Sequence, residues 1–269
     1  MMTRILAKGY LWFLLALLYS PILIIMIFSF TEAKVLGNWT GFSTKLYSSL
    51  FTGGMHHSLM NAIWNTFAIA TIAATASTLL GSLAAIGIFN LRSRARQVMN
   101  FTNAIPMMNA EIVMGVSLML LFIAFHMTLG FGTILIAHIT FNIPYVILSV
   151  MPRLRQTNVS TYEAAMDLGA TPLSAFFKVV LPDLAPGITS GFLLAFTMSL
   201  DDFIITYFTR GAGINTLSTL IYSEVRKGIK PTMNALSTVM FVSVLLLLVL
   251  MNTLPDMRDK RKRKQEEKS

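Results

Sequence analysis

The sequence predicts an all-α membrane protein with six transmembrane helices. Its 269 residues are 55% hydrophobic and only 12% charged, whereas soluble domains carry about 25% charged residues. The mean hydropathy is +0.67, and the length suffices for about six spans of ~20 residues joined by short loops. The chain has no cysteine, so disulfides, thiol catalysis and thiolate metal sites are excluded.

Six apolar runs are assigned as the spans. They cover residues 9–30, 59–89, 99–125, 131–151, 187–209 and 234–254 of a single domain, 1–269. The first run is long for a signal peptide, and no clear small-x-small cleavage site follows it, so a retained anchor is predicted. The second run exceeds one perpendicular crossing, which predicts that it tilts or extends beyond the bilayer.

The distribution of basic residues predicts the orientation of the spans. Fifteen of the 21 Lys and Arg residues fall in the two ends of the chain and in the loops around 92–96 and 152–186. Because loops rich in Lys and Arg stay in the cytoplasm, both termini and the 152–186 loop are expected inside. Loops 31–58 and 211–233 are then outside. The basic tail 255–269 is interpreted as a stop-transfer signal that also contacts anionic lipid.

The cytoplasmic loop contains a short polar helix with defined ends. Ser160 and Glu163 have the spacing of a capping box, and Gly169 supplies a left-handed stop. Thr171 and Pro172 have the pattern of a cap and of the first residue of a second short helix. A rigid helix in the loop of a membrane protein indicates a surface on which another protein docks.

Three carboxylates, Glu111, Asp201 and Asp202, fall inside predicted spans. A centrally placed Asp costs about 2.5–3.5 kcal/mol on insertion scales, so each acid requires a physical explanation. Counted along ideal helices from the cytoplasmic side, all three lie about 20 Å deep, at a common level. This pattern favours a pathway for a cation. The alternative is that one aspartate caps a local helix break and accepts backbone N–H bonds.

The two aspartates are adjacent, and adjacent residues of one helix point about 100° apart. Asp202 shares its face with polar residues, whereas the neighbours of Asp201 on its own face are mostly apolar. Asp202 is therefore expected to face water, and Asp201 a packed surface or a partner chain. The divergence also argues against an aspartyl protease, which needs two carboxylates that share a proton.

Other catalytic chemistries find no support in the sequence. It has no Gly-x-x-x-x-Gly-Lys-Ser/Thr segment, so no nucleotide binding through a P-loop is expected, and energy must come from a partner. The histidines lack the His-Glu-x-x-His spacing of zinc proteases. We therefore expect a subunit without enzymatic activity, metal or cofactor.

The segment 162–170 resembles the EAA loop of ABC importer permeases, and Leu181 and Pro182 match the Leu-Pro pair that follows in that family. The external segment 38–47 and the segment 199–203 are similar to those of polyamine permeases. The resemblance covers nearly the full length and is closest to the PotC-type inner-membrane permeases of spermidine/putrescine importers. It implies a six-span permease of the methionine-importer type in a bacterial cytoplasmic membrane.

The resemblance also implies partners and site residues. The partners are a PotB-type permease, two PotA-type ATPase subunits and a PotD-type extracytoplasmic binding protein, and the substrate is a polyamine. The residues implied in coupling to the ATPase are Glu163, Ala164, Ala165, Asp167 and Gly169. Glu111, Asp201 and Asp202 are the expected pathway acids, and Trp39 is either an interfacial aromatic or a cation–π contact in the outer vestibule.

Two other functions remain open at this point. A secondary transporter or channel for organic cations would account for the acids inside the spans, but not for a rigid cytoplasmic helix of this pattern. An ABC importer permease for another cationic substrate would account for both features.

The orientation can be tested with single cysteines, because the native chain has none. Cysteines at Thr40 and Asn215 are expected to react with an impermeant thiol reagent added outside the cell, and cysteines at Ser93 and Thr157 are not. The reverse labelling pattern would contradict the orientation drawn from the basic residues.

Overall fold

The computed structural model describes residues 2–32, 38–52, 56–157, 159–228, 231–246 and 249. Within this part the predicted all-α class is confirmed, because its regular elements are helices and the β contact between Thr31 and Phe42 is an isolated bridge. The chain divides into two compact units, residues 61–219 and residues 1–60 with 220–269.

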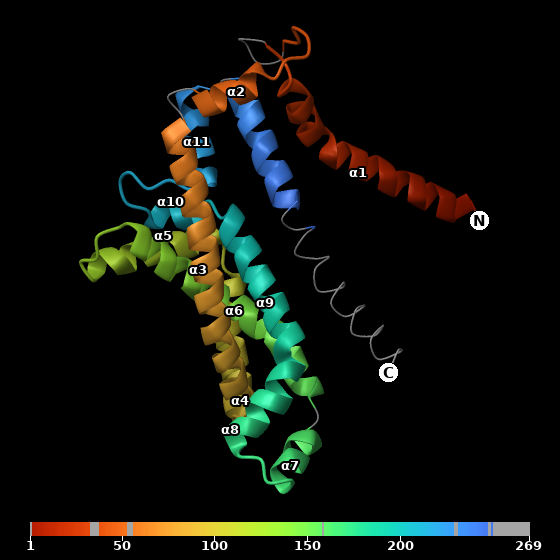
Figure 1. The fold of residues 1–269 in the computed structure, drawn as a ribbon, viewed down its shortest axis with the longest axis vertical. Helices are drawn as coiled ribbons and strands as arrows, with labels where there is room; N and C mark the ends of the chain where they lie inside the picture. Colours follow the sequence, from red (N-terminus) through yellow and green to blue (C-terminus); the bar gives the residue numbers. More distant parts are fainter. Residues whose placement is uncertain are drawn as a thin grey trace. The chain divides into compact units, whose positions relative to one another are not determined.

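The larger unit holds most of the long helices (Figure 1). Its elements are α3 (His56–Phe89), α4 (Ser93–Met108), α5 (Glu111–Ala124), α6 (Phe131–Gln156), α7 (Val159–Asp167), α8 (Pro172–Ala175), α9 (Leu181–Asp201) and α10 (Ile204–Thr209). Among all the described residues, the helices long and apolar enough to cross a membrane are Lys8–Phe28, His57–Phe89, Phe131–Gln156 and Pro172–Asp201. A further crossing results if α4 and α5 together form one broken span.

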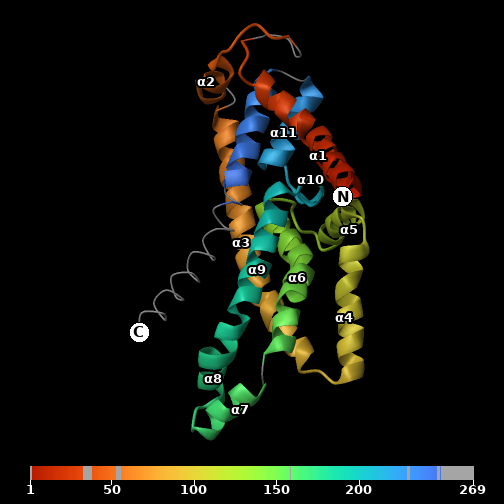
Figure 2. The same cartoon turned by 90° about the vertical axis from the view of Figure 1, so that its right-hand side faces the viewer.

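The third predicted span, 99–125, is not one helix. It consists of the end of α4 and the whole of α5, which are bent by 102° relative to each other, as Figure 2 shows. Asn109 and Ala110 adopt extended backbone between them. Glu111 then opens α5, where a carboxylate in the first turn interacts favourably with the helix dipole. Apolarity alone did not reveal this break.

The fifth predicted span, 187–209, begins earlier and ends earlier than expected. A continuous helical segment runs from Pro172 to Asp201 and includes a π-helical turn, Phe176–Val180. The Leu181 amide donates to the Phe176 carbonyl, five residues back. Pro182 follows immediately and has no N–H to donate, which is consistent with a local shift of the hydrogen-bond register at this point.

Helices α6 and α9 run side by side (Figure 1) and approach closely at small residues. A Cβ built on Gly187 would lie 3.3 Å from the Ser149 carbonyl oxygen, and one on Gly191 would lie 3.3 Å from a Val146 methyl. The Ser149 hydroxyl donates to the Gly187 carbonyl at 3.1 Å. Small residues and hydrogen bonds between helices are the usual means of association within a membrane, where burial of apolar surface contributes little.

The smaller unit contains α1 (Met2–Phe28), α2 (Lys45–Thr52) and most of α11 (Leu217–Lys227). The segment after α1 is folded back on itself: Phe30 stacks on Phe42, and the Ser29 and Tyr47 hydroxyls lie 2.6 Å apart. Lys45 donates to Glu32 at 2.5 Å, and this hydrogen bond and the lysine charge lower the pKa of the Glu32 carboxyl. The described part of the segment between α1 and α2 is therefore compact.

The end of the chain is only partly described. A shorter apolar helix, Thr232–Leu246, occupies the beginning of the sixth predicted span. The rest of 234–254, apart from residue 249, and the whole basic tail 255–269 lie outside the described residues.

Two glycines of α3 provide a matched test of the packing in the larger unit. A Cβ on Gly81 would lie 2.8 Å from the Val146 Cβ, whereas one on Gly87 would meet nothing within 4 Å. Gly81→Ala is expected to lower the stability of the detergent-solubilised protein by about 1–3 kcal/mol through overpacking. Gly87→Ala is expected to leave it unchanged or raise it by up to about 1 kcal/mol, since Ala favours helix. Equal thermal midpoints for the two variants would contradict the packing of α3 on α6.

Candidate functional site

The predicted stop at Gly169 is confirmed. Gly169 has φ +88°. Its amide donates to the Met166 carbonyl at 2.9 Å, and the Ala170 amide donates to the Ala165 carbonyl at 3.1 Å. This pair of hydrogen bonds is the Schellman motif, which ends a helix sharply. The helix that it ends, α7, begins at Val159, so Ser160 lies inside it. The prediction of Ser160 as the cap was therefore wrong.

The predicted second helix after Gly169 is also confirmed. Thr171 precedes α8, and its hydroxyl accepts from the Ser174 amide at 3.3 Å, while Pro172 occupies the first turn. We call the segment α7–α8, with the turn between them, the docking lobe. It lies at one end of the larger unit (Figure 2).

The docking lobe presents apolar side chains that are not packed within it. Leu168 is 90% exposed and Leu173 is 71% exposed, and Phe177 in the following turn is 59% exposed. Of the predicted coupling residues, Glu163, Ala164, Asp167 and Gly169 are exposed and Ala165 is half-buried. The exposed apolar side chains around the turn between α7 and α8 are suited to contact a partner protein.

Asp202 forms the cap of a helix break. Helix α9 ends at Asp201, Asp202 has extended backbone with ψ 129°, and α10 starts two residues later. Its carboxylate accepts from the Ile205 amide at 3.3 Å and from the Thr206 amide and hydroxyl, both at 2.8 Å. The Asp202 side chain is only 6% exposed. The helix-cap alternative therefore applies to Asp202.

The prediction that Asp202 faces water was wrong. Asp201 is exposed and Asp202 is buried. The prediction failed because it placed both residues on one continuous helix, whereas the backbone leaves the helix after Asp201. The hydrogen bonds that Asp202 makes across the break explain how a buried carboxylate is tolerated there.

Glu111 is exposed at the start of α5. One turn later, Gly115 approaches α10, where its built Cβ would lie 3.4 Å from the Ile204 carbonyl oxygen. Glu111 is about 6 Å from Gly115 along the helix, and Asp201 is three residues from Ile204. The structure thus brings Glu111 and Asp201 to within roughly 10 Å of one α5–α10 contact, given the spacing of Cα atoms.

Sequence reasoning did not single out His138 as a partner of these acids. It lies in α6, its side chain is 2% exposed, and its Nε2 atom is 3.3 Å from an Asp202 oxygen and 2.9 Å from the Thr206 hydroxyl. The available signal was the presence of a histidine inside an apolar span. No local spacing links it to residues more than 60 positions away along the chain.

Trp39 belongs to the smaller unit. It is 48% exposed, and its ring makes an edge contact with Phe28 at 6.3 Å between ring centres. Part of the indole is therefore held by its neighbour, and the rest remains open to a ligand or to the membrane interface.

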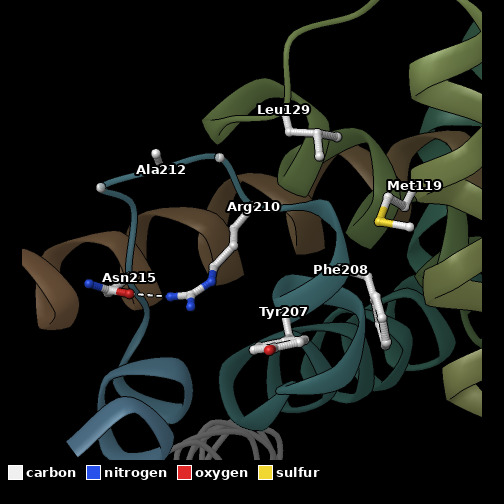
Figure 3. A pocket seen from close by; sticks show the side chains of 9 residues that line it. Met119, Leu129, Tyr207, Phe208, Arg210, Ala212 and Asn215 are labelled. Atoms are coloured by element: carbon white, nitrogen blue, oxygen red, sulfur yellow. Dashed lines mark hydrogen bonds between the residues drawn. The ribbon is translucent and has the colours of Figure 1, made fainter.

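A shallow hollow of about 470 Å³ lies beside α10 (Figure 3). Arg210 crosses one side of it, donates to the Asn215 side chain, and places its guanidinium 5.5 Å from the Tyr207 ring centre. The intramembrane acids do not line it. Because its one charged side chain is positive, this hollow is not suited to a cationic ligand.

Comparisons with known proteins identify the family. Residues 77–264 match the profile of the family described as "Binding-protein-dependent transport system inner membrane component". The chain belongs to this family. It is 36% identical over 249 residues to the spermidine/putrescine transport system permease protein PotC of Escherichia coli (strain K12), with 93% of each chain covered. It is 41% identical over 234 residues to the putrescine transport system permease protein PotI of the same organism, which covers 84% of this chain and 82% of PotI.

Solved structures show the same fold. One chain of a bacterial ABC transporter involved in the import of the acidic polysaccharide alginate superposes with a TM-score of 0.75 at 15% identity, covering 94% of this chain and 96% of that one. A chain of the MetNI methionine ABC transporter superposes with a TM-score of 0.64 at 16% identity, covering 76% and 97%. The chain is thus a multi-pass ABC permease, and the predicted methionine-importer type of fold is confirmed.

The contrast between the aspartates leads to a stability test. Asp202→Ala removes the carboxylate that Thr206 and Ile205 contact, and is expected to lower the stability of the solubilised protein by about 1–3 kcal/mol. Asp201→Ala, at the exposed neighbouring position, is expected to change it by less than about 0.5 kcal/mol. Thermal unfolding of the two purified variants measures both. Equal losses would contradict the assignment of Asp202 as the buried cap.

Proposed function

We propose that this chain is a permease subunit of an ATP-driven importer of polyamines such as spermidine and putrescine. The observation that carries the proposal is the placement of the exposed carboxylates Glu111 and Asp201 near one helix contact, in a chain that is 36–41% identical to named polyamine permeases. A polycation that leaves water requires fixed negative charge in a passage of low dielectric constant. These two acids supply such charge.

The three acids have different roles in this proposal. Glu111 and Asp201 face the passage. Asp202 is buried, and its role is to stabilise the backbone at the break between α9 and α10. Trp39 contributes an aromatic face on the external side, where it would make a cation–π contact with an ammonium group of the substrate. The chain supplies half of the passage, and a paralogous PotB-type permease supplies the other half.

The docking lobe couples this subunit to the energy source. Exposed Leu168 and Leu173 fit an apolar groove on a PotA-type ATPase, and Glu163 and Asp167 contribute polar contacts at its edge. Two ATPase copies serve the two permeases, and a PotD-type binding protein delivers the substrate from outside. The chain itself carries out no hydrolysis. It lies in a bacterial cytoplasmic membrane with both termini inside.

The pathway role is tested by uptake of labelled spermidine and putrescine in cells that produce the complete importer. Glu111→Gln and Asp201→Asn remove charge with little change in size, and each is expected to lower the uptake rate about tenfold or more at equal membrane expression. Asp183→Asn, in the first turn of α9, is the matched control and is expected to retain wild-type uptake. Wild-type rates for both Glu111→Gln and Asp201→Asn would place the pathway elsewhere.

The coupling role is tested at Gly169. A branched side chain is strained at φ +88°, so Gly169→Val is expected to distort the end of α7 and lower both uptake and substrate-stimulated ATP hydrolysis roughly tenfold. Gly169→Asn is the matched control, because Asn tolerates the left-handed region, and it is expected to retain most of both activities. Normal ATP hydrolysis and uptake in a well-expressed Gly169→Val complex would remove the docking lobe from the mechanism.

A further inference from the structure

A closed polar network joins α6 to the break between α9 and α10. Its members are His138, Asp202 and Thr206, and their side chains are almost completely buried. The His138 Nε2 atom lies 2.9 Å from the Thr206 hydroxyl and 3.3 Å from the Asp202 Oδ2 atom. The Thr206 hydroxyl in turn lies 2.8 Å from the same Oδ2 atom. The three polar groups satisfy one another away from water.

The direction of the hydrogen bonds follows from the donors available. An ionised carboxylate only accepts, so the single proton of the Thr206 hydroxyl is donated to Asp202. The Thr206 oxygen must then accept from His138, which requires a proton on Nε2. The network thus runs from the His138 N–H through the Thr206 hydroxyl to Asp202. The Thr206 amide also donates to Asp202 and fixes the start of α10.

We propose that His138 is a positioning residue that holds the α9–α10 break and thereby keeps Asp201 exposed to the passage. The inference rests on the proposed function, in which Asp201 faces a cationic substrate. Without the imidazole donor, the Thr206 hydroxyl loses the N–H from which it accepts, and this weakens the hydrogen bond that the hydroxyl donates to the buried Asp202 carboxylate. The segment then rearranges to satisfy it, and Asp201, its immediate neighbour, loses its position.

The rearrangement that follows removal of the imidazole is expected to be local, because other hydrogen bonds hold α6 against α9 and α10. One turn away, the Asn142 amide donates to the Ser199 hydroxyl at 2.7 Å, and Ser149 bonds to Gly187 further along the same helix pair. At the other end of α10, Thr133 donates to the Thr209 carbonyl at 2.8 Å. Because these bonds do not involve His138, α6 is expected to stay packed on α9 and α10 when the imidazole is removed.

The test combines side-chain replacements with a thiol reporter at the position that His138 is proposed to control. Asp201→Cys gives the chain its single cysteine. Its rate of reaction with a small water-soluble methanethiosulfonate is measured in the assembled importer, with His138, His138→Leu or His138→Gln. His138→Gln keeps an N–H donor near the position of Nε2. His138→Leu keeps a side chain of similar volume but has no donor. A cysteine at Thr40 reports the general reactivity of each preparation.

His138→Leu is expected to slow labelling at position 201 about tenfold, the change that loss of a hydrogen bond of about 1.4 kcal/mol produces in an equilibrium. His138→Gln is expected to restore labelling to within about twofold of the parent, and labelling at position 40 stays constant. In the same importer without the added cysteine, spermidine uptake is expected to fall with His138→Leu and to recover with His138→Gln.

Thr206→Val tests whether His138 acts through the Thr206 hydroxyl. It removes the hydroxyl through which His138 reaches Asp202, so the variant that combines it with His138→Leu is expected to be no slower in uptake than Thr206→Val alone. Thr140→Val is the control, because Thr140 is exposed on α6 and its hydroxyl donates to the Ile136 carbonyl of the same helix. It is expected to behave as wild type.

Two results would overturn the proposal. One is unchanged labelling at position 201 in His138→Leu, and the other is a His138→Gln variant as defective in labelling and uptake as His138→Leu. The labelling arm needs no transported substrate. A wild-type importer that accumulates no polyamine therefore contradicts the proposed substrate, while the labelling ratio still decides the role of His138.

Discussion

The carboxylate of Asp202 has to be satisfied without water, and the fifth span is built around that requirement. It accepts hydrogen bonds from the backbone and side chain at the start of α10 and lies against His138 of α6. A regular helix could not have offered those amides, because they would already be bonded within it. The break therefore accommodates the acid, and the acid stabilises the break. The neighbouring Asp201, the last residue of α9, is exposed.

The same helical segment links the two functional regions of the larger unit. It begins at Pro172, in the docking lobe, and ends at Asp201. Close packing at Gly187 and Gly191 holds this segment against α6. In the proposed function, a displacement imposed on the docking lobe is carried along this packed helix toward the acids, through the π-helical turn Phe176–Val180. Coupling by such a segment requires no contact between the lobe and the substrate.

Local sequence patterns predicted the local features well. Gly169, Thr171 and Pro172 define helix ends through short-range backbone chemistry, and each lies where that chemistry placed it. The environments of Asp201 and Asp202 were not predictable in the same way, because they depend on a break whose partner, His138, lies on another helix. The bend after Met108 was missed for a similar reason, since apolarity reports that a segment is buried and not whether it is straight. The family resemblance predicted the fold class correctly, but it did not predict that Asp202 is the buried acid.

The proposed role of this chain is to provide the membrane passage of an ATP-driven polyamine importer. Its most direct test is accumulation of radiolabelled spermidine in proteoliposomes that contain this chain with its permease, ATPase and binding-protein partners. ATP supplied on the ATPase side is expected to drive accumulation against a gradient, and unlabelled putrescine in excess is expected to reduce it. Equilibration of spermidine without ATP, or accumulation only of an uncharged solute, would contradict the claim.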